Sequence, residues 1–397
     1  MPELIDFEEA QRLILEHVSP LPAEPVAIAD VYGRVAAEDV ASVVNLPPFD
    51  SSAMDGFAVR AEDTPGSLPV VFHIAAGSPA PRPLGPGEAM GIGTGGALPA
   101  GADAVIPIEY VVQSDNVAEI AEAVPPGANV RPVGGDLRQD EAVVSAGTVL
   151  GPAQVGALAA AGVAQVVSAR RPRATVLATG SELRAPGEPL RPGQIYEANG
   201  PILDAQLQSA GAEVERLPPV ADDEDAHRDA IARGLEADVL LTTGGVSVGV
   251  HDLVRQVESE LGVREVFWGV SVRPGKPISF GVRESRLVFG LPGNPVSALV
   301  GFELFVRPAV LALQGAAQPG PDWERGRLVE SVHANPSRDE LIRARATVGD
   351  EGIELEPLAG RESHMIARAA GANALVLVPR SAGGVAAGST VRYLRLG

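Results

Sequence analysis

The chain contains no cysteine. Disulfide bridges, thiolate metal sites and cysteine nucleophiles are therefore excluded. No uninterrupted apolar run approaches the ~18 residues of a membrane span. The first residues, MPELIDFEEAQ, are acidic and lack the basic-then-apolar arrangement of a signal peptide. We therefore expect a protein that crosses no membrane and works in the cytoplasm.

Basic residues are scarce and almost all of one kind. The chain has 31 Lys and Arg against 51 Asp and Glu, a formal net charge of −20. A field of that sign repels nucleic acid and anionic membranes, so we expect neither as a partner. Lys276 is the single lysine in the sequence. Codon bias toward arginine explains most of this skew, but it does not explain why the remaining lysine stands in the turn RPGKP.

Several common site signatures have little support. GIGTGG (91–96) matches the letters of GxGxxG but lies in the expected β module and opens no expected helix, and GVSVG (245–249) matches GxSxG over five letters only. Dinucleotide-binding and serine-hydrolase interpretations therefore have little support. The six histidines are scattered along the chain, which argues against a zinc site. Mg²⁺ held by carboxylates together with substrate phosphates remains open.

A chain of 397 residues predicts two to four domains. Residues 7–18 have an amphipathic helical pattern, with Asp6 as the expected N-cap. Short apolar runs separated by Pro/Gly-rich turns predict a small β module and a C-terminal β domain. The expected domains are a helical linker (1–43 and 142–171), an inserted β module (44–141), an α/β domain (172–318) and a C-terminal β domain (319–397).

The region 173–313 alternates strands and helices at the spacing of a doubly wound, mostly parallel sheet. The expected fold class is therefore multidomain, α/β plus β. Its last helix, PVSALVGFELFVRPAVLAL, contains Pro308, which should kink or split it.

Three polar segments follow expected strands of this region, where open α/β sheets bind ligands. LATGSEL presents Glu182, which is either a ligand or a helix-capping acid. TTGGVSVGVHD offers backbone N–H groups for an anion, and its Asp252 is equally an N-cap or a ligand. In GLPGNPVSA, Asn294 is an expected N-cap and Pro295 fits the first helical position, so a free helix N-terminus forms an anion site.

Further candidates lie outside these loops. Arg273 and Lys276 flank a Pro-Gly turn that holds an ammonium group suited to an oxyanion, unless the lysine is simply solvated. In the β module, PPFDSSAMDGFAV presents Asp55, and a glycine-rich loop presents Thr94. Asp136 stands between two arginines, where a surface ion pair is the alternative.

Together these segments resemble the molybdopterin molybdenumtransferases, the MoeA family, which is related to the C-terminal part of gephyrin. PPFDSSAMDGFAV, GTGGALPAGADAVIP, GGDLR, ATGSEL, TTGGVSVGVHD, RPGKP and GLPGNPVSA occur in the family's order from about residue 5 to 395. The resemblance implies a molybdopterin-binding α/β domain and a reaction between adenylylated molybdopterin and molybdate that releases AMP. It also implies Mg²⁺, a homodimer whose cleft joins the α/β domain of one subunit to the β module of the other, and the molybdopterin adenylyltransferase as a candidate hand-over partner.

The same resemblance assigns roles to individual positions. The implied catalytic residues are Asp55, Asp136, Glu182, Asp222, Asp252 and Lys276. The implied substrate-binding residues are Thr94, Gly244, Gly245, Ser247, Gly249, Arg273, Pro292, Asn294, Pro295, Ser297, Arg343 and Ser363. Glu182, Asp222 and Asp252 are the implied Mg²⁺ ligands. Arg338, Arg343 and Ser363 correspond to the segments RDELIR and RESH, which match less closely, and Arg273 stands where other members have lysine.

Two rival functions remain. A molybdopterin adenylyltransferase shares the TTGG-type loop, but it is expected to be a single compact domain. A gephyrin-like scaffold without catalysis would bind a partner through its C-terminal domain, although intact carboxylates and Lys276 count against it.

Overall fold

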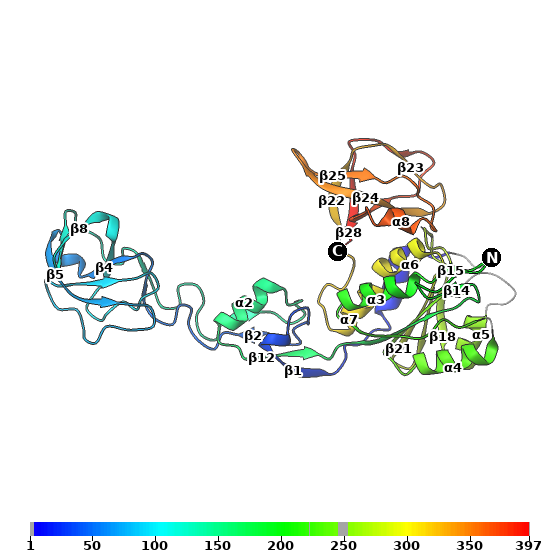
Figure 1. The fold of residues 1–397 in the computed structure, drawn as a ribbon, viewed down its shortest axis with the longest axis horizontal. Helices are drawn as coiled ribbons and strands as arrows, with labels where there is room; N and C mark the ends of the chain where they lie inside the picture. Colours follow the sequence, from blue (N-terminus) through cyan, green and yellow to red (C-terminus); the bar gives the residue numbers. More distant parts are fainter. Residues whose placement is uncertain (1–3, 222, 245–252, 397) are drawn as a thin grey trace.

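The computed structural model describes residues 4–221, 223–244 and 253–396. Figure 1 shows a β module at one end, a slender linker in the middle, and an α/β domain with a second β domain at the other end. Each part contains its own buried apolar cluster. The chain is therefore a multidomain α/β plus β protein.

The linker is built from two short antiparallel pairs and one helix. Its helix begins at Pro152, which occupies the first turn, where the missing N–H costs nothing. The elements are β1 (Ala23–Ala27) with β12 (Gln165–Ala169), β2 (Val40–Ala41) with β11 (Ala142–Val144), and α2 (Pro152–Ala160). Because chain segments from both sides of the β module pair here, the module is an insertion into the linker.

The β module is a six-stranded sheet in the order β7-β4-β6-β5-β9-β8. The central strand β4 is buried on both faces, and apolar clusters cover each face. Its elements are β3 (Ser51–Ser52), β4 (Gly56–Val59), β5 (Gly66–Ile74), β6 (Ala89–Ile92), β7 (Ala104–Pro107), η3 (Ile108–Tyr110), β8 (Val111–Ser114), β9 (Val117–Ile120) and β10 (Val130–Arg131).

The α/β domain has a six-stranded sheet in the order β16-β13-β17-β21-β20-β18, in which the first four strands are parallel. Strand residues alternate between two clusters on opposite faces, such as Leu241 and its neighbour Leu240. Helices cover both faces, so the expected doubly wound, mostly parallel sheet is confirmed. Its elements are β13 (Arg173–Ala178), β14 (Leu183–Arg184), β15 (Ile195–Tyr196), α3 (Asn199–Ser209), β16 (Glu213–Arg216), α4 (Glu224–Gly234), β17 (Val239–Thr243), α5 (Leu253–Glu260), β18 (Arg264–Trp268), β19 (Val272–Arg273), β20 (Ser279–Arg283) and β21 (Arg286–Leu291).

The last helix of this domain is split as expected. It consists of α6 (Pro295–Gly301), a π-helical segment η4 (Phe302–Val306) and α7 (Arg307–Leu313). Pro308 has no N–H to donate four residues back, and the freed carbonyl of Leu304 accepts a bond of 2.8 Å from Gln11 Nε2. The whole stretch Pro295–Leu313 meets the length and hydropathy criteria for a membrane span, but 78% of the apolar window is buried inside the protein. It is therefore a core helix of the α/β domain.

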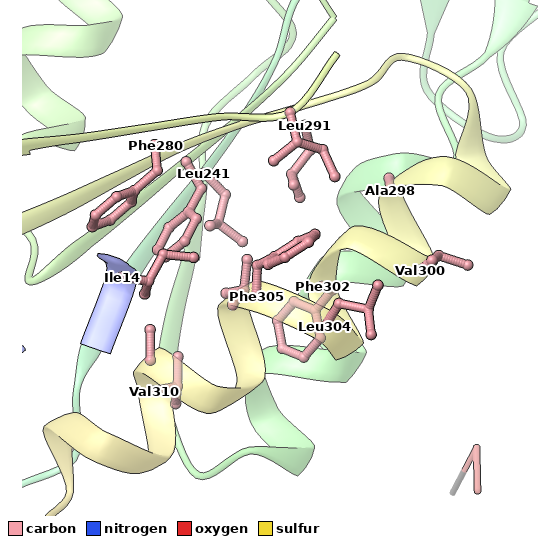
Figure 2. Packing of buried hydrophobic residues seen from close by; sticks show 14 of the residues in the cluster. Ile14, Leu241, Phe280, Leu291, Ala298, Val300, Phe302, Leu304, Phe305 and Val310 are labelled. Carbon is pink, nitrogen blue, oxygen red and sulfur yellow. The ribbon is translucent and has the colours of Figure 1, made fainter. Parts of the chain in front are cut away.

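The N-terminal helix α1 (Phe7–Leu15) packs on this split helix and not in the linker. Figure 2 shows Ile14 of α1 in the same cluster as Leu241, Phe280 and Val310. The expected domain division places residues 1–43, and therefore α1, in the linker. In the structure, the buried face of α1 instead packs in the core of the α/β domain. Asp6 stands at the N-cap position without capping the helix, because its carboxylate instead accepts a bond of 2.8 Å from Arg380 Nη1.

The C-terminal β domain is a closed barrel. Strand β24 pairs with both β25 and β26, and the pairings β25–β22, β22–β28 and β28–β26 complete the ring. Its elements are β22 (Glu324–Leu328), β23 (Val332–His333), β24 (Asp339–Gly349), β25 (Gly352–Pro357), α8 (Ile366–Ala369), β26 (Ala374–Val378), β27 (Gly384–Val385) and β28 (Thr390–Arg395). Strand β19 of the α/β domain adds to β24, so the barrel is joined to that domain by backbone pairing.

Candidate functional site

The loops after β13, β17 and β21 meet at one edge of the α/β sheet. Thr179 N donates to the carbonyl of Thr243 over 2.9 Å, and Gly244 N donates to the carbonyl of Leu291 over 3.3 Å. Gly244 has φ +91°, and a Cβ there would lie 2.5 Å from the Thr179 carbonyl oxygen. A glycine is therefore required where these loops approach each other. The described parts of the three segments expected to bind ligands therefore lie side by side, with residues 242–244 representing the second.

Asn199, at the start of α3, links two of these loops. Its buried amide donates to Thr243 Oγ1 over 2.6 Å and to the carbonyl of Gly293 over 2.9 Å. Thr243 Oγ1 in turn donates to the carbonyl of Pro292 over 3.3 Å. A fully bonded polar group at this depth fixes the relative position of the loops.

A cleft of about 520 Å³ opens above these strand ends. Residues from five segments line it. They are Ala178, Thr179, Gly180, Glu182, Leu183, Ile195, Tyr196, Glu197, Ala198, Asn199, Thr243, Gly244, Gly293, Asn294, Pro295, His364 and Ile366. Glu182 is exposed at its wall, as its position in LATGSEL predicts.

The other candidate Mg²⁺ ligands cannot be placed. Asp222 and Asp252 lie outside the described residues, as do Gly245, Ser247 and Gly249 of the TTGG loop. Within the described part of the chain, no group of three acidic or histidine side chains is arranged to hold a metal ion. Of the three implied Mg²⁺ ligands, Glu182 is therefore the one among the described residues. Its carboxylate oxygen atoms are hard donors, which suit Mg²⁺.

The RPGKP turn borders a second, smaller hollow of about 260 Å³. It is lined by Arg273, Pro274, Gly275, Lys276, Pro277, Pro292, Asn294, Ser297, Arg338, Arg361, Glu362 and Ser363. Four of these side chains are cationic and one is a carboxylate, so the hollow is locally positive in a strongly acidic protein. Arg273 Nη1 lies 3.1 Å from Oε1 of the buried Glu340 on β24, which neutralises part of that charge.

The barrel contributes a loop, residues 360–365, that separates the two hollows. Asn294 Nδ2 donates to Ser363 Oγ over 2.9 Å, and Val296 N donates to the Ser363 carbonyl over 3.1 Å. Asn294 therefore stands at the N-cap position without capping α6, which corrects the expected N-cap. The expectation that the N-terminus of α6 is free is also wrong, because the Val296 N–H in its first turn donates to the Ser363 carbonyl of the barrel.

Arg343 holds this loop from behind. Its buried guanidinium donates to the carbonyls of Gly360, Glu362 and Met365. Burial lowers the pKa of Arg343 from its ordinary value, and the nearby Arg368 charge acts in the same direction. Arg343 therefore supports the small hollow through the loop that carries Ser363, and it does not line either hollow.

Asp55, Thr94 and Asp136 lie far from these hollows within one chain. Figure 1 places the β module beyond the linker, at the opposite end from the α/β domain. Asp55 Oδ1 accepts the Thr94 N–H over 2.6 Å and the Thr94 hydroxyl over 2.7 Å. The backbone bond and then the hydroxyl bond hold the pKa of Asp55 below its ordinary value. Asp136 is exposed in a neighbouring loop.

Sequence reasoning missed residues that the structure brings to both hollows. Glu197 precedes α3, Asn199 begins it, and Tyr196 ends β15. Arg361 and His364 come from the barrel loop. The run YEANG directly before an expected helix is a signal that could have identified the first group. The barrel loop has no comparable signal, because more than 60 residues separate it from the strand ends it covers.

Comparison with known proteins follows this division of the chain. Three family models match in succession: the MoeA N-terminal region (domain I and II) at residues 5–162, a "Probable molybdopterin binding domain" at 175–312, and the MoeA C-terminal region (domain IV) at 325–396. Together they span nearly the whole chain.

Curated relatives and solved structures agree. A molybdopterin molybdenumtransferase of Staphylococcus aureus is 33% identical over 98% of this chain and 94% of its own length. One from Haemophilus influenzae is 34% identical over 98% of both chains. The crystal structure of a molybdopterin biosynthesis MoeA protein from Pyrococcus horikoshii has a TM-score of 0.84 at 29% identity, covering 99% of this chain and 100% of its own.

The fold and the two hollows define a multidomain protein built around an α/β domain with a polar ligand-binding edge. The comparisons show that the chain belongs to the molybdopterin molybdenumtransferase family, the MoeA proteins. The expected resemblance and fold class are thereby confirmed.

Proposed function

We propose that the chain inserts molybdenum into molybdopterin, the last step of molybdenum cofactor biosynthesis. Adenylylated molybdopterin and molybdate react, the phosphoanhydride bond is broken, AMP leaves, and the dithiolene holds the molybdenum. The observation that carries this proposal is the pair of hollows that share Asn294. One is large and lined by strand-end loops, and the other is small and cationic, which suits two anionic substrates that must meet.

The two hollows suit different substrates. The cleft of about 520 Å³ has the size for an organic ligand, whereas the hollow of about 260 Å³ suits a compact oxyanion. Lys276 and Arg338 supply positive charge to the smaller hollow, and Arg361 adds to it. We assign molybdate to the smaller hollow and the phosphorylated pterin to the larger one. Local charge at this edge offsets the overall −20.

Magnesium belongs to the proposal as a cofactor. Glu182 at the cleft wall would hold it, together with Asp222 and Asp252, which the family resemblance implies as ligands and which lie outside the described residues. When bound beside the pyrophosphate, Mg²⁺ would neutralise and polarise it. The Glu182 carboxylate lies close to the backbone of its own turn, since a Cβ on Gly180 (φ +149°) would lie 2.5 Å from Glu182 Oε2.

A homodimer completes the proposed site. Asp55 and Thr94 cannot reach the α/β cleft of their own chain in this arrangement, so they would act on the cleft of a second copy (Figure 1). Exposed apolar side chains near Asp55 give that copy a surface to cover, among them Met54 and Ile108. We also propose a cytoplasmic location and hand-over of the substrate by the molybdopterin adenylyltransferase, whose reaction produces it.

The test is AMP release from adenylylated molybdopterin with and without molybdate, with Mg²⁺ present. We expect molybdate-dependent release in the wild-type chain. Release in neither condition would contradict the enzyme and support a scaffold. Turnover of ATP with molybdopterin would instead identify an adenylyltransferase.

A further inference from the structure

An aromatic and an aliphatic side chain lie next to each other in the lining of the main cleft. Ile195 and Tyr196, the two residues of β15, are 55% and 46% exposed, although both line the cavity. Polar side chains also line the cleft, among them Glu197, Asn199 and Asn294. A single exposed apolar side chain needs no explanation, but an aromatic and an aliphatic side chain presented together to a cavity indicate a ligand surface.

The segment that carries this pair is held in place without a ligand. Strand β15 pairs in parallel with β14, and Ile195 N donates to the carbonyl of Glu182 over 3.0 Å. The Tyr196 hydroxyl donates to the carbonyl of Glu188 over 3.0 Å, which limits rotation of the ring. A ring fixed in advance loses little conformational entropy when a ligand stacks on it.

The strand pair β14–β15 also connects Tyr196 to Glu182, the proposed Mg²⁺ ligand. Glu182 immediately precedes β14, and Glu197 N donates to the carbonyl of Arg184 over 2.9 Å. A ligand that rests on Tyr196 therefore shares the cavity with Glu182 and with the strand-end loops that line it. Such a ligand has a flat apolar portion joined to a charged portion.

We propose that Ile195 and Tyr196 form the platform on which the flat nitrogen heteroaromatic ring of the substrate stacks. This proposal rests on the proposed function, in which the substrate carries two such rings, an adenine and a pterin, on either side of its pyrophosphate. Stacking on an aromatic side chain tolerates either ring, because each has a π face. Tyr196 is thus a binding residue for the substrate and does not take part in bond breaking.

The experiment compares the wild-type chain with Tyr196→Ala, Tyr196→Phe and Tyr32→Ala. Tyr32 is 65% exposed in the linker and serves as the control for loss of a surface tyrosine. We expect Tyr196→Ala to raise KM for adenylylated molybdopterin about tenfold with kcat within about twofold, because stacking is lost equally from the ground and transition states. Tyr196→Phe keeps the ring and should stay within about threefold of wild type in KM.

Calorimetric binding of AMP, ribose 5-phosphate and 6-hydroxymethylpterin then identifies the ring. Weaker binding of AMP but not of ribose 5-phosphate assigns the platform to adenine, and weaker binding of the pterin assigns it to that ring. An unchanged KM in Tyr196→Ala overturns the platform, and so does a Tyr196→Phe effect as large as that of alanine. Wild-type molybdate-dependent AMP release is measured in parallel, and its absence would defeat the proposed function itself.

Discussion

Arg273 Nη1 on β19 lies 3.1 Å from Glu340 Oε1 on β24, and this ion pair joins the α/β domain to the barrel. The carboxylate is buried, whereas the guanidinium is 43% exposed at the rim of the small hollow. Removing the arginine leaves a buried charge without its partner. The two cations of RPGKP therefore have different roles, one partly structural and one free to meet an anion.

We predict that Arg273→Ala lowers the free energy of unfolding by about 1–3 kcal/mol, since Glu340 loses its counter-charge. Thermal unfolding followed by circular dichroism measures this. Lys276→Ala is the matched control, because Lys276 forms no ion pair among the described residues, and its melting temperature should stay close to that of wild type. Equal destabilisation by both substitutions would contradict the structural role of the pair.

Lys276→Ala should instead reduce turnover at least tenfold, in line with the ~10²–10³ lost when one electrostatic stabiliser is removed. The measurement is the rate of AMP release at saturating substrate. Lys276→Arg retains the charge and should recover part of the rate. A wild-type rate in Lys276→Ala would show that this lysine is simply solvated.

The proposed dimer predicts complementation between two defective chains. Asp55→Asn removes the carboxylate that the β module contributes to the proposed site, and Lys276→Ala removes the ammonium group that the α/β domain contributes. Each variant homodimer should therefore be nearly inactive. Mixed dimers contain one intact composite site, and equal mixing with subunit exchange should restore about a quarter of wild-type activity. Light scattering coupled to gel filtration confirms the dimers. Mixtures that stay inactive despite exchange would place both residues in the site of one chain.

The Thr94–Asp55 contact predicts a pH effect. Donation by Thr94 holds the pKa of Asp55 below its ordinary value near 3.8. The pKa of Asp55 is thus lower in the folded chain than in the unfolded chain. Its ionised carboxylate therefore stabilises the fold at pH values above the unfolded-state pKa, and this stabilisation is lost as the pH falls through the folded-state pKa. Thr94→Val removes the hydrogen bond from the hydroxyl but keeps the one from the backbone N–H, which lowers the pKa of Asp55 more. The pKa of Asp55 should therefore rise only part of the way to its ordinary value. Carboxyl ¹³C NMR titration measures it, with Thr94→Ser as the unchanged control.

The net charge of −20 predicts an unusual salt dependence. Both proposed substrates are anions, so the overall field opposes their approach. Added monovalent salt screens that field, and the association rate should therefore rise between about 0.01 and 0.15 M ionic strength. Stopped-flow measurement of substrate binding tests this. A rate that falls steadily with salt would show that the local cations dominate at long range.

Much of the fold followed from local patterns. The alternation of apolar strands and amphipathic helices in 173–313 predicts the α/β sheet, and the position of Pro308 predicts the split helix. Glycine at position 244 and the Pro-Gly-Asn-Pro run mark the loops at the strand ends. These features depend on side-chain period and on backbone restrictions within a few residues, so they are legible in the sequence.

The sequence by itself determined the multidomain α/β plus β fold class, the strand-end loops and the absence of thiol chemistry. Tertiary structure alone decided that Asn199 links Thr243 to Gly293, that Ser363 covers the start of α6, and that Arg343 holds a loop. It also decided that the β module, which carries Asp55, lies apart from the α/β domain, which carries Glu182 (Figure 1). These relations join residues tens to more than a hundred positions apart. No local period or propensity specifies such contacts, because they depend on how distant elements pack within a domain and how the domains pack together.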